Sequence, residues 1–137
     1  MDEEYLEAVL DVADRVPPGR ATTYGLIAEV LRERLGRPKE KFMVTFQSRC
    51  GPEEWWQPYT DKTMEKLGDE GIKRIAVMNP GFVSDCLETL EEIAGEAGEI
   101  FQHHGGEKFL HIPCLNDSPE GMGVLEKVVR RELQGWV

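Results

Sequence analysis

The sequence predicts an α/β fold, in which a small three-stranded parallel sheet with helices on both faces follows a helical hairpin. Two observations predict it. Short apolar runs at 42–47, 75–78 and 108–112 fit buried strands. Stretches with helical periodicity separate these runs, and parallel strands need connections of that length. Each crossover between strands is then expected to be right-handed.

The helical hairpin comes first. Residues 3–16 form its first predicted helix, because apolar side chains recur on one helical face (Leu6, Val9, Leu10 and Ala13). The Pro-Pro-Gly run at 17–19 ends this helix, since proline lacks the N–H that a helix needs. A second helix is expected over about 24–35, and Gly36 ends it.

The chain is organised around residues 73–92. A strand at 75–78 is broken by the Asn-Pro-Gly run at 79–81. Ser84 or Asp85 then supplies an N-cap oxygen for an acidic helix that extends to about residue 104. This order places polar side chains at the carboxyl end of a sheet, where open α/β folds keep their sites.

The acidic helix carries three carboxylates on one face. Glu88, Glu92 and Glu96 lie four residues apart, so they follow one another along the helix. One interpretation is a solvated acidic face; the other is a carboxylate ladder that receives a cation or protons. Spacing alone does not decide between them. Gly95 and Gly98 lie in the interior of this helix and are expected to weaken it.

Two further helices complete the α/β alternation. One runs over about 61–69 and ends at Gly71. The other runs over 119–133, where Pro119 follows Ser118 in the arrangement that favours a helix start. Its apolar side chains are expected to be buried on one side (Met122, Leu125, Val128, Val129 and Leu133).

Length, charge and composition narrow the classes of function that this chain can have. At 137 residues the chain has the length of one domain over 1–137, and its net charge of −10 opposes binding to nucleic acid. It contains no apolar run long enough for a transmembrane helix. The acidic start MDEEYLEA is unlike a signal peptide, and the cysteines form no CxxC pair. We therefore expect a cytoplasmic protein with reduced thiols, Cys50, Cys86 and Cys114.

Three blocks of sequence resemble ferrochelatase, the enzyme that inserts ferrous iron into protoporphyrin. They are KFMVTFQSRCGPEEWWQPYTDKT at 41–63, GFVSDCLETLEE at 81–92 and EKFLHIPCLNDSPEG at 107–121. The resemblance extends from about Leu31 to the C-terminus. It implies the carboxyl-terminal part of a ferrochelatase, with a sheet that is half of a Rossmann-type or chelatase-like fold.

The resemblance also implies site residues, with a porphyrin and ferrous iron or another divalent metal as ligands. Glu88 is expected to be catalytic, and the metal would meet Glu88, Glu92 and Glu96. Porphyrin contacts are expected at Trp55, Ser84 and Cys86. Alternatives stay open for two of these: Trp55 and Trp56 can cover a sheet end, and Cys86 can be a small buried helix residue.

The resemblance also implies that this site is incomplete. The catalytic histidine of ferrochelatase lies on an upstream strand, and none of His103, His104 and His111 matches it. We therefore expect an inactive, ferrochelatase-derived fragment. The loss of that strand would leave an exposed sheet edge, which favours a homodimer or a strand- or helix-exchanged oligomer.

The first 30 residues resemble a different family. PPGRATTYGLIAEVL at 17–31 is similar to the start of the DNA-binding domain of alkyltransferase-like proteins and alkylguanine-DNA alkyltransferases, in which the residue at Tyr24 lies near the DNA backbone. The recognition helix of that family does not follow. The sequence thus suggests an engineered chimera joined near Leu31. Alternatives are an α/β chimera without activity and, less favoured, a DNA-binding module.

Overall fold

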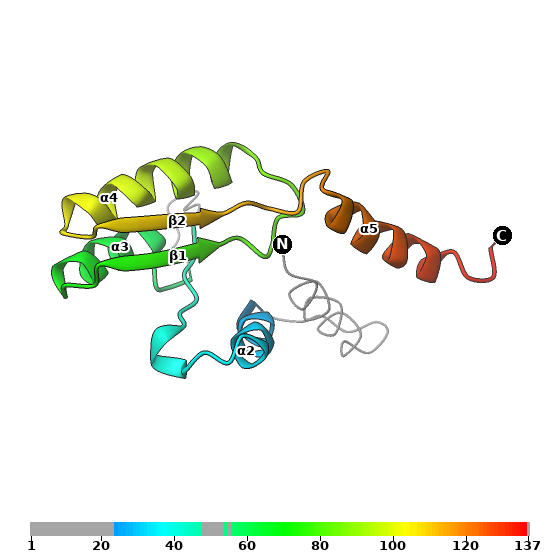
Figure 1. The fold of residues 1–137 in the computed structure, drawn as a ribbon, viewed down its shortest axis with the longest axis horizontal. Helices are drawn as coiled ribbons and strands as arrows, with labels where there is room; N and C mark the ends of the chain where they lie inside the picture. The colour runs from blue at the N-terminus through cyan, green and yellow to red at the C-terminus, as the bar shows by residue number, and fades with distance from the viewer. Residues whose placement is uncertain (1–23, 48–53, 55, 137) are drawn as a thin grey trace. The chain divides into compact units, whose positions relative to one another are not determined.

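A computed structural model describes residues 24–47, 54 and 56–136. It divides the chain into two compact units (Figure 1): residues 1–44 with 115–137, and residues 45–114. Each unit is described by itself, and a single domain over 1–137 stays a prediction. The first predicted helix (3–16), Cys50 and Trp55 lie outside the described residues.

The unit of residues 45–114 is built on two parallel strands. Strand β1 (Arg74–Met78) pairs with β2 (Lys108–Ile112), in register from Arg74 opposite Lys108 to Met78 opposite Ile112. The carbonyl of Lys73 accepts the N–H groups of Glu107 and Lys108, which starts the pairing. Both strands lie where the apolar runs predicted them, and the mixed α/β class is confirmed.

The third predicted strand, at 42–47, is not formed. Within the described residues, only Phe46 of this run pairs, in an isolated parallel bridge with Tyr59. The N–H of Phe46 donates to Pro58, and its carbonyl accepts the N–H of Thr60. A strand needs a partner along its whole length, whereas this run meets only the short segment that precedes the next helix. The apolar pattern alone therefore predicted one strand too many for the described sheet.

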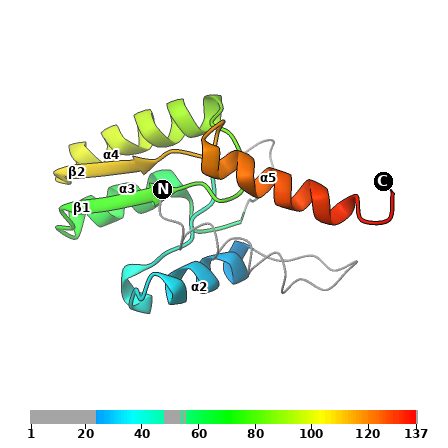
Figure 2. The same cartoon turned by 45° about the vertical axis from the view of Figure 1, so that its right-hand side comes forward.

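Three helical segments of this unit pack on one face of the strands. They are α3 (Thr60–Asp69), the π-helix η2 (Glu88–Ala97) and α4 (Gly98–His103), which continues η2. Their buried side chains form one core with the same-face strand residues (Met64, Ala97, Phe101, Ile75 and Phe109). Figure 2 shows α3 and α4 beside the strands.

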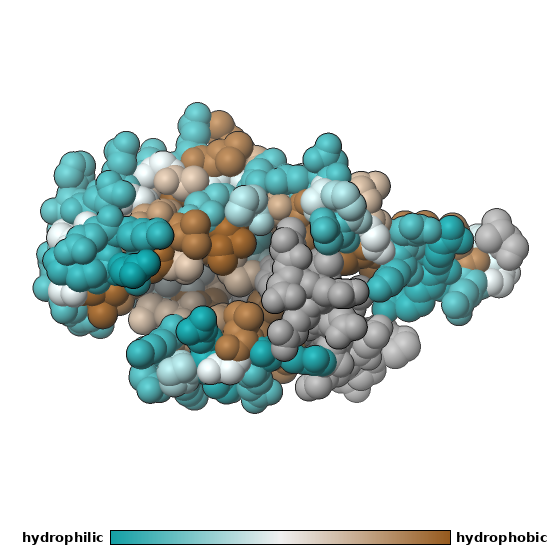
Figure 3. Space-filling view, in the orientation of Figure 1, coloured by the Kyte–Doolittle hydropathy of each residue, from teal (hydrophilic) through white to brown (hydrophobic). Residues whose placement is uncertain are grey.

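The opposite face of the strands is open within this unit. Leu110 is exposed there, and Figure 3 shows apolar surface over the two strands. The helices of residues 45–114 thus cover one face of the strands, and helices on both faces of the sheet stay a prediction. Alternation explains it: Ile75 and Phe109 point into the core, so Ala76 and Leu110 point away from it.

Glycines end two of these helices. Gly71 after α3 has φ +82°, and Gly105 after α4 has φ +100°. The N–H of Ile72 donates to Leu67, and that of Gly106 to Phe101, which satisfies the last carbonyls of each helix. The predicted stop at Gly71 is confirmed.

The other unit contributes α2 (Tyr24–Arg34), the short 3-10 turn η1 (Lys39–Lys41) and α5 (Pro119–Glu132). Gly36, at φ +59°, ends α2 as predicted. Ser118 caps α5, since its hydroxyl oxygen accepts the N–H of Gly121 at 3.0 Å. Within this unit most of the apolar side chains of α5 are exposed (Met122, Leu125, Val129 and Leu133), so the burial predicted for its apolar side is not found there.

No helix among the described residues is long and apolar enough to cross a membrane.

Candidate functional site

The candidate site begins where β1 ends. Asn79 follows the strand, and its side-chain amide lies 3.0 Å from Nε2 of His111 on β2. The N–H of Phe82 donates to the carbonyl of Asn79, which closes a turn. The strand ends are thus joined by a polar contact at the carboxyl edge of the sheet. Sequence reasoning missed His111, although its register opposite Val77 brings it within reach of the residue after Met78.

Asp85 ties the start of the acidic helix to the end of β2. Its Oδ1 accepts the hydroxyl proton of Thr89 at 2.9 Å, and its Oδ2 accepts the N–H of Cys114 at 3.2 Å. The hydroxyl oxygen of Thr89 accepts the N–H of Cys86 at 2.9 Å. The predicted N-cap at Ser84 or Asp85 is therefore wrong: η2 has no side-chain cap, Asp85 bonds elsewhere, and Ser84 is an exposed loop residue.

The carboxylate ladder lies along η2. Glu88 is half-buried and accepts a long contact of 3.8 Å from the thiol of Cys86. Glu92 is also half-buried, and its Oε2 accepts the side-chain amide of Gln47 at 2.6 Å. Glu96 is exposed. The three carboxylates thus run from a partly enclosed end to open solvent.

The π-helical form of η2 preserves this arrangement. Its hydrogen bonds connect residues five apart, and such segments are frequent at functional sites. Four residues slightly exceed one turn of an α-helix but fall slightly short of one turn of a π-helix. The carboxylates therefore stay on one face in either form. The sequence pattern did not distinguish the two.

The two described cysteines differ. Cys114 is buried, and burial together with the hydrogen bond and charge of Asp85 raises the pKa of its thiol to about 12. Such a thiol stays protonated and is a poor metal ligand. Cys86 is half-buried, and its thiol lies 3.8 Å from Oε2 of Glu88. The turn after β2 leads into α5, with Asn116 at φ +50°.

The aromatic part of the site is only partly described. Trp55 lies outside the described residues. Trp56 is 76% exposed, and its ring lies 6.5 Å from that of Phe46 at an angle of 40°. An indole with a free face can stack on a flat aromatic ligand.

The other histidines lie apart from these contacts. His103 is exposed at the end of α4, and Nδ1 of His104 lies 2.8 Å from Oδ1 of Asp69. Within the residues that the structure describes, no three His, Cys, Asp or Glu side chains are grouped closely enough to hold a metal ion together. A closed chelate of Glu88, Glu92 and Glu96 is therefore not preformed.

Comparison with known proteins gives one family. The family model described as ferrochelatase matches residues 20–133. A ferrochelatase of Agrobacterium fabrum is 84% identical over 110 residues, which is 80% of this chain and 32% of that protein. One of Rhizobium meliloti is 74% identical over 110 residues, with the same coverage of both chains. One of Chelativorans sp. is 65% identical over 106 residues, 77% of this chain and 30% of that protein.

The chain therefore spans about a third of the length of these curated relatives. The match begins at residue 20, eleven residues before the start that the sequence motifs indicated at Leu31. It contains β1, β2, η2 and the ladder of carboxylates. The chain belongs to the ferrochelatase family.

Proposed function

We propose that this chain forms the carboxyl-terminal part of a ferrochelatase-type site, where a porphyrin and a divalent cation, ferrous iron in the family reaction, come together. One observation carries this proposal. Three carboxylates follow one another along η2, from half-buried Glu88 to exposed Glu96. A cation or a proton that travels along this face meets an acceptor at each turn.

Metal insertion into a porphyrin requires groups that accept protons and bind a divalent cation. Metal insertion into a porphyrin releases two pyrrole protons, and a carboxylate accepts protons readily. Glu88 is the proposed acceptor, because it is the member of the ladder nearest the strand ends along the chain. Oxygen ligands suit hydrated divalent cations. Since the three carboxylates are not preformed into a chelate, each would hold a cation singly and weakly, as transit requires.

The porphyrin would lie at the same edge of the sheet. The proposed contacts are Ser84 and Cys86 in the segment after β1, with Trp55 providing an aromatic face. The thiol of Cys86 supports this placement, since it contacts Glu88. The exposed ring of Trp56, the neighbour of Trp55 in the sequence, supports an aromatic platform before α3.

We expect no metal insertion by this chain alone. By resemblance, the catalytic histidine of the family has no counterpart among His103, His104 and His111. General acid-base help is worth roughly 10²–10⁴ in rate. Enclosure of the substrate adds to this through positioning. The function proposed is therefore binding without turnover, and the alternative is a purely structural α/β protein.

Two predictions about origin and assembly stay open. The resemblance of residues 1–30 to alkyltransferase-like proteins suggests a chimera. The ferrochelatase match begins at residue 20, so it overlaps the end of this segment. A DNA-binding role remains disfavoured by the net charge of −10. An oligomer is proposed because the described sheet has only two strands and both have a free edge within their unit.

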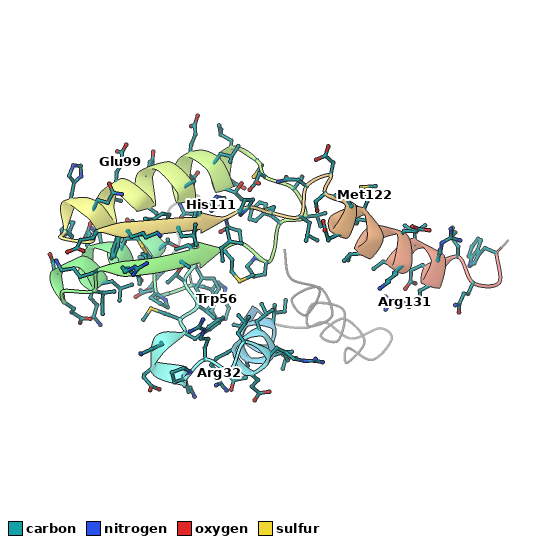
Figure 4. The ribbon with its side chains drawn as sticks, viewed as in Figure 1. Arg32, Trp56, Glu99, His111, Met122 and Arg131 are labelled. Atoms are coloured by element: carbon teal, nitrogen blue, oxygen red, sulfur yellow. The ribbon has the colours of Figure 1, made fainter. Side chains whose placement is uncertain are left out.

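Binding and turnover are tested together. Protoporphyrin is titrated against the protein with tryptophan fluorescence as readout, and zinc insertion into mesoporphyrin is followed by absorbance. Glu88→Gln is compared with Glu99→Gln, an exposed glutamate on α4 of the same continuous helix (Figure 4). We expect quenching by porphyrin and no insertion.

Zinc binding, measured by calorimetry, is expected to weaken in Glu88→Gln and to stay unchanged in Glu99→Gln. Absence of both porphyrin and zinc binding would favour the structural alternative. Turnover by the unmodified chain that disappears in Glu88→Gln would show that the site is complete after all.

A further inference from the structure

Asp85 is an acidic residue of the candidate site to which the proposed function gives no role. It lies three residues before Glu88, so helical spacing alone would add it to the ladder as a fourth carboxylate. Its contacts indicate a different role. Oδ1 accepts the hydroxyl proton of Thr89 at 2.9 Å, and Oδ2 accepts the N–H of Cys114 at 3.2 Å. A cation that took either oxygen would therefore compete with a donor of the protein itself.

The contacts of Asp85 join two segments of the unit of residues 45–114. Cys114 follows β2, and Thr89 is the second residue of η2. The thiol of Cys114 also hydrogen-bonds to Asp85, so two groups of Cys114 meet this carboxylate. Thr89 and Cys114 are both buried, and a hydrogen bond is electrostatically stronger there than in water. Asp85 thus connects the amino end of η2 to the carboxyl end of the sheet.

The same network surrounds Glu88. The hydroxyl oxygen of Thr89 accepts the N–H of Cys86 at 2.9 Å. Since Cys86 and Thr89 lie on either side of Glu88 in the sequence, the backbone is held before and after it. The thiol of Cys86 lies 3.8 Å from Oε2 of Glu88. No side chain among the described residues caps η2, so this network supplies the side-chain hydrogen bonds of its first turn.

We propose that Asp85 is a positioning residue, which acts through Thr89 to orient Glu88 toward a cation and is not itself a ligand of the ladder. This inference rests on the proposed function, in which Glu88 accepts a cation or a proton. Hydrogen-bond partners that orient a metal ligand matter nearly as much as the ligand, and their loss typically lowers metal affinity about 10- to 100-fold. A direct ligand role for Asp85 predicts the opposite response when its bond to Thr89 is removed.

Thr89→Val separates the two roles, because it removes the hydroxyl and leaves every carboxylate in place. If Asp85 positions Glu88, zinc binding to the full chain, measured by calorimetry, should weaken about tenfold. Thr89→Ser keeps the hydroxyl and should restore most of the affinity. Thr63→Val removes a buried hydroxyl elsewhere in the same unit, where it donates to Tyr59, and should leave zinc binding unchanged. Circular dichroism checks that each variant is folded at the temperature of the titration.

A measurement without any ligand makes the test independent of the proposed function. The χ1 rotamer of Glu88 is measured by NMR from three-bond couplings. One rotamer should dominate in the unmodified chain and in Thr89→Ser, whereas Thr89→Val should show averaging over several rotamers. Asp85→Asn is a second variant with the same expected averaging, because its amide group cannot accept the N–H of Cys114 as the second carboxylate oxygen does.

Several results would overturn the proposal. Unchanged zinc affinity in Thr89→Val would show that the network is structural only. Tighter zinc binding in Thr89→Val would show that the released Oδ1 of Asp85 is itself a ligand. An equal weakening in Thr63→Val would assign the effect to lost stability. If the unmodified chain binds no zinc, the proposed function fails, and the Glu88 rotamer alone decides: averaging in the variants supports positioning, and an unchanged rotamer overturns it.

Discussion

Replacing Thr89 by valine removes one hydroxyl from a buried polar network. Thr89 is 1% exposed, donates to Asp85 at 2.9 Å and accepts the N–H of Cys86 at 2.9 Å. Valine has nearly the same shape, so the packing is kept and no cavity forms. The cost is therefore electrostatic, and it has two parts.

The first part is the bond to a carboxylate, since hydrogen bonds to charged groups contribute about 1.5–3 kcal/mol. The second is the N–H of Cys86, which loses its acceptor in a half-buried position at a cost of about 1 kcal/mol. Asp85 still holds the N–H of Cys114, so the network is weakened rather than lost. We expect the free energy of unfolding to fall by about 2.5–4 kcal/mol in total.

The chain offers a matched control in Thr63. It is also buried, at 6% exposure, and its hydroxyl donates to the carbonyl of Tyr59 at 2.7 Å. That carbonyl also accepts the N–H of Thr63, so Thr63→Val leaves no group unpaired at this contact. It should cost about 1 kcal/mol or less. Urea unfolding, followed by circular dichroism, measures both variants, and equal losses for the two would refute the reasoning.

Three further predictions rest on single contacts. Phe101→Ala empties the fully buried centre of the core and should cost about 3–5 kcal/mol in urea unfolding; a loss below 1 kcal/mol would contradict the described core. Gly106→Ala places a Cβ in a clash with the ring of Phe101 and should lower the melting temperature, whereas Gly123→Ala meets nothing within 4 Å and should stabilise α5 by up to about 1 kcal/mol. The pKa of the Cys114 thiol, about 12, lies above its ordinary value of 9.0, so the folded state keeps a proton that the unfolded state loses. Stability should therefore be unaffected by this thiol below pH 9 and fall as the pH rises above it; unfolding of wild type and Cys114→Ala at pH 8 and 10 checks this, and identical pH slopes would contradict it.

Much of the fold was visible in the sequence because it depends on local patterns. The apolar runs at 75–78 and 108–112, the stop at Gly71 and the cap at Ser118 each follow from a few neighbouring residues. The run at 42–47 has the same local pattern, but a strand also requires a partner, which no local pattern supplies. The interior Gly98 is predicted from the sequence to weaken its helix. In the structure its missing side chain also lets the Phe109 ring approach, since a Cβ on Gly98 would lie only 3.2 Å from that ring.

The features of the candidate site likewise fall into those that local spacing predicts and those that depend on distant contacts. The ladder of Glu88, Glu92 and Glu96 was found because helical spacing puts its members on one face. The contact of Asn79 with His111 joins residues 32 apart, and that of Asp85 with Cys114 joins residues 29 apart. These contacts depend on strand register, which the sequence does not reveal. The π-helical form of η2 was missed because apolar and charged residues repeat similarly in both kinds of helix.

The bond between Gln47 and Glu92 makes two parts of the candidate site thermodynamically linked. Oε2 of Glu92 accepts the amide of Gln47 at 2.6 Å, so a cation or proton that takes this oxygen competes with that amide. Gln47 is the neighbour of Phe46, whose ring lies against Trp56. A ligand that binds beside Phe46 and shifts Gln47 therefore changes the affinity of Glu92 for a cation or proton. By thermodynamic reciprocity, a cation or proton on Glu92 changes the affinity for that first ligand by the same factor. One hydrogen bond thereby couples ligand binding at Glu92 to ligand binding at the Phe46–Trp56 ring pair.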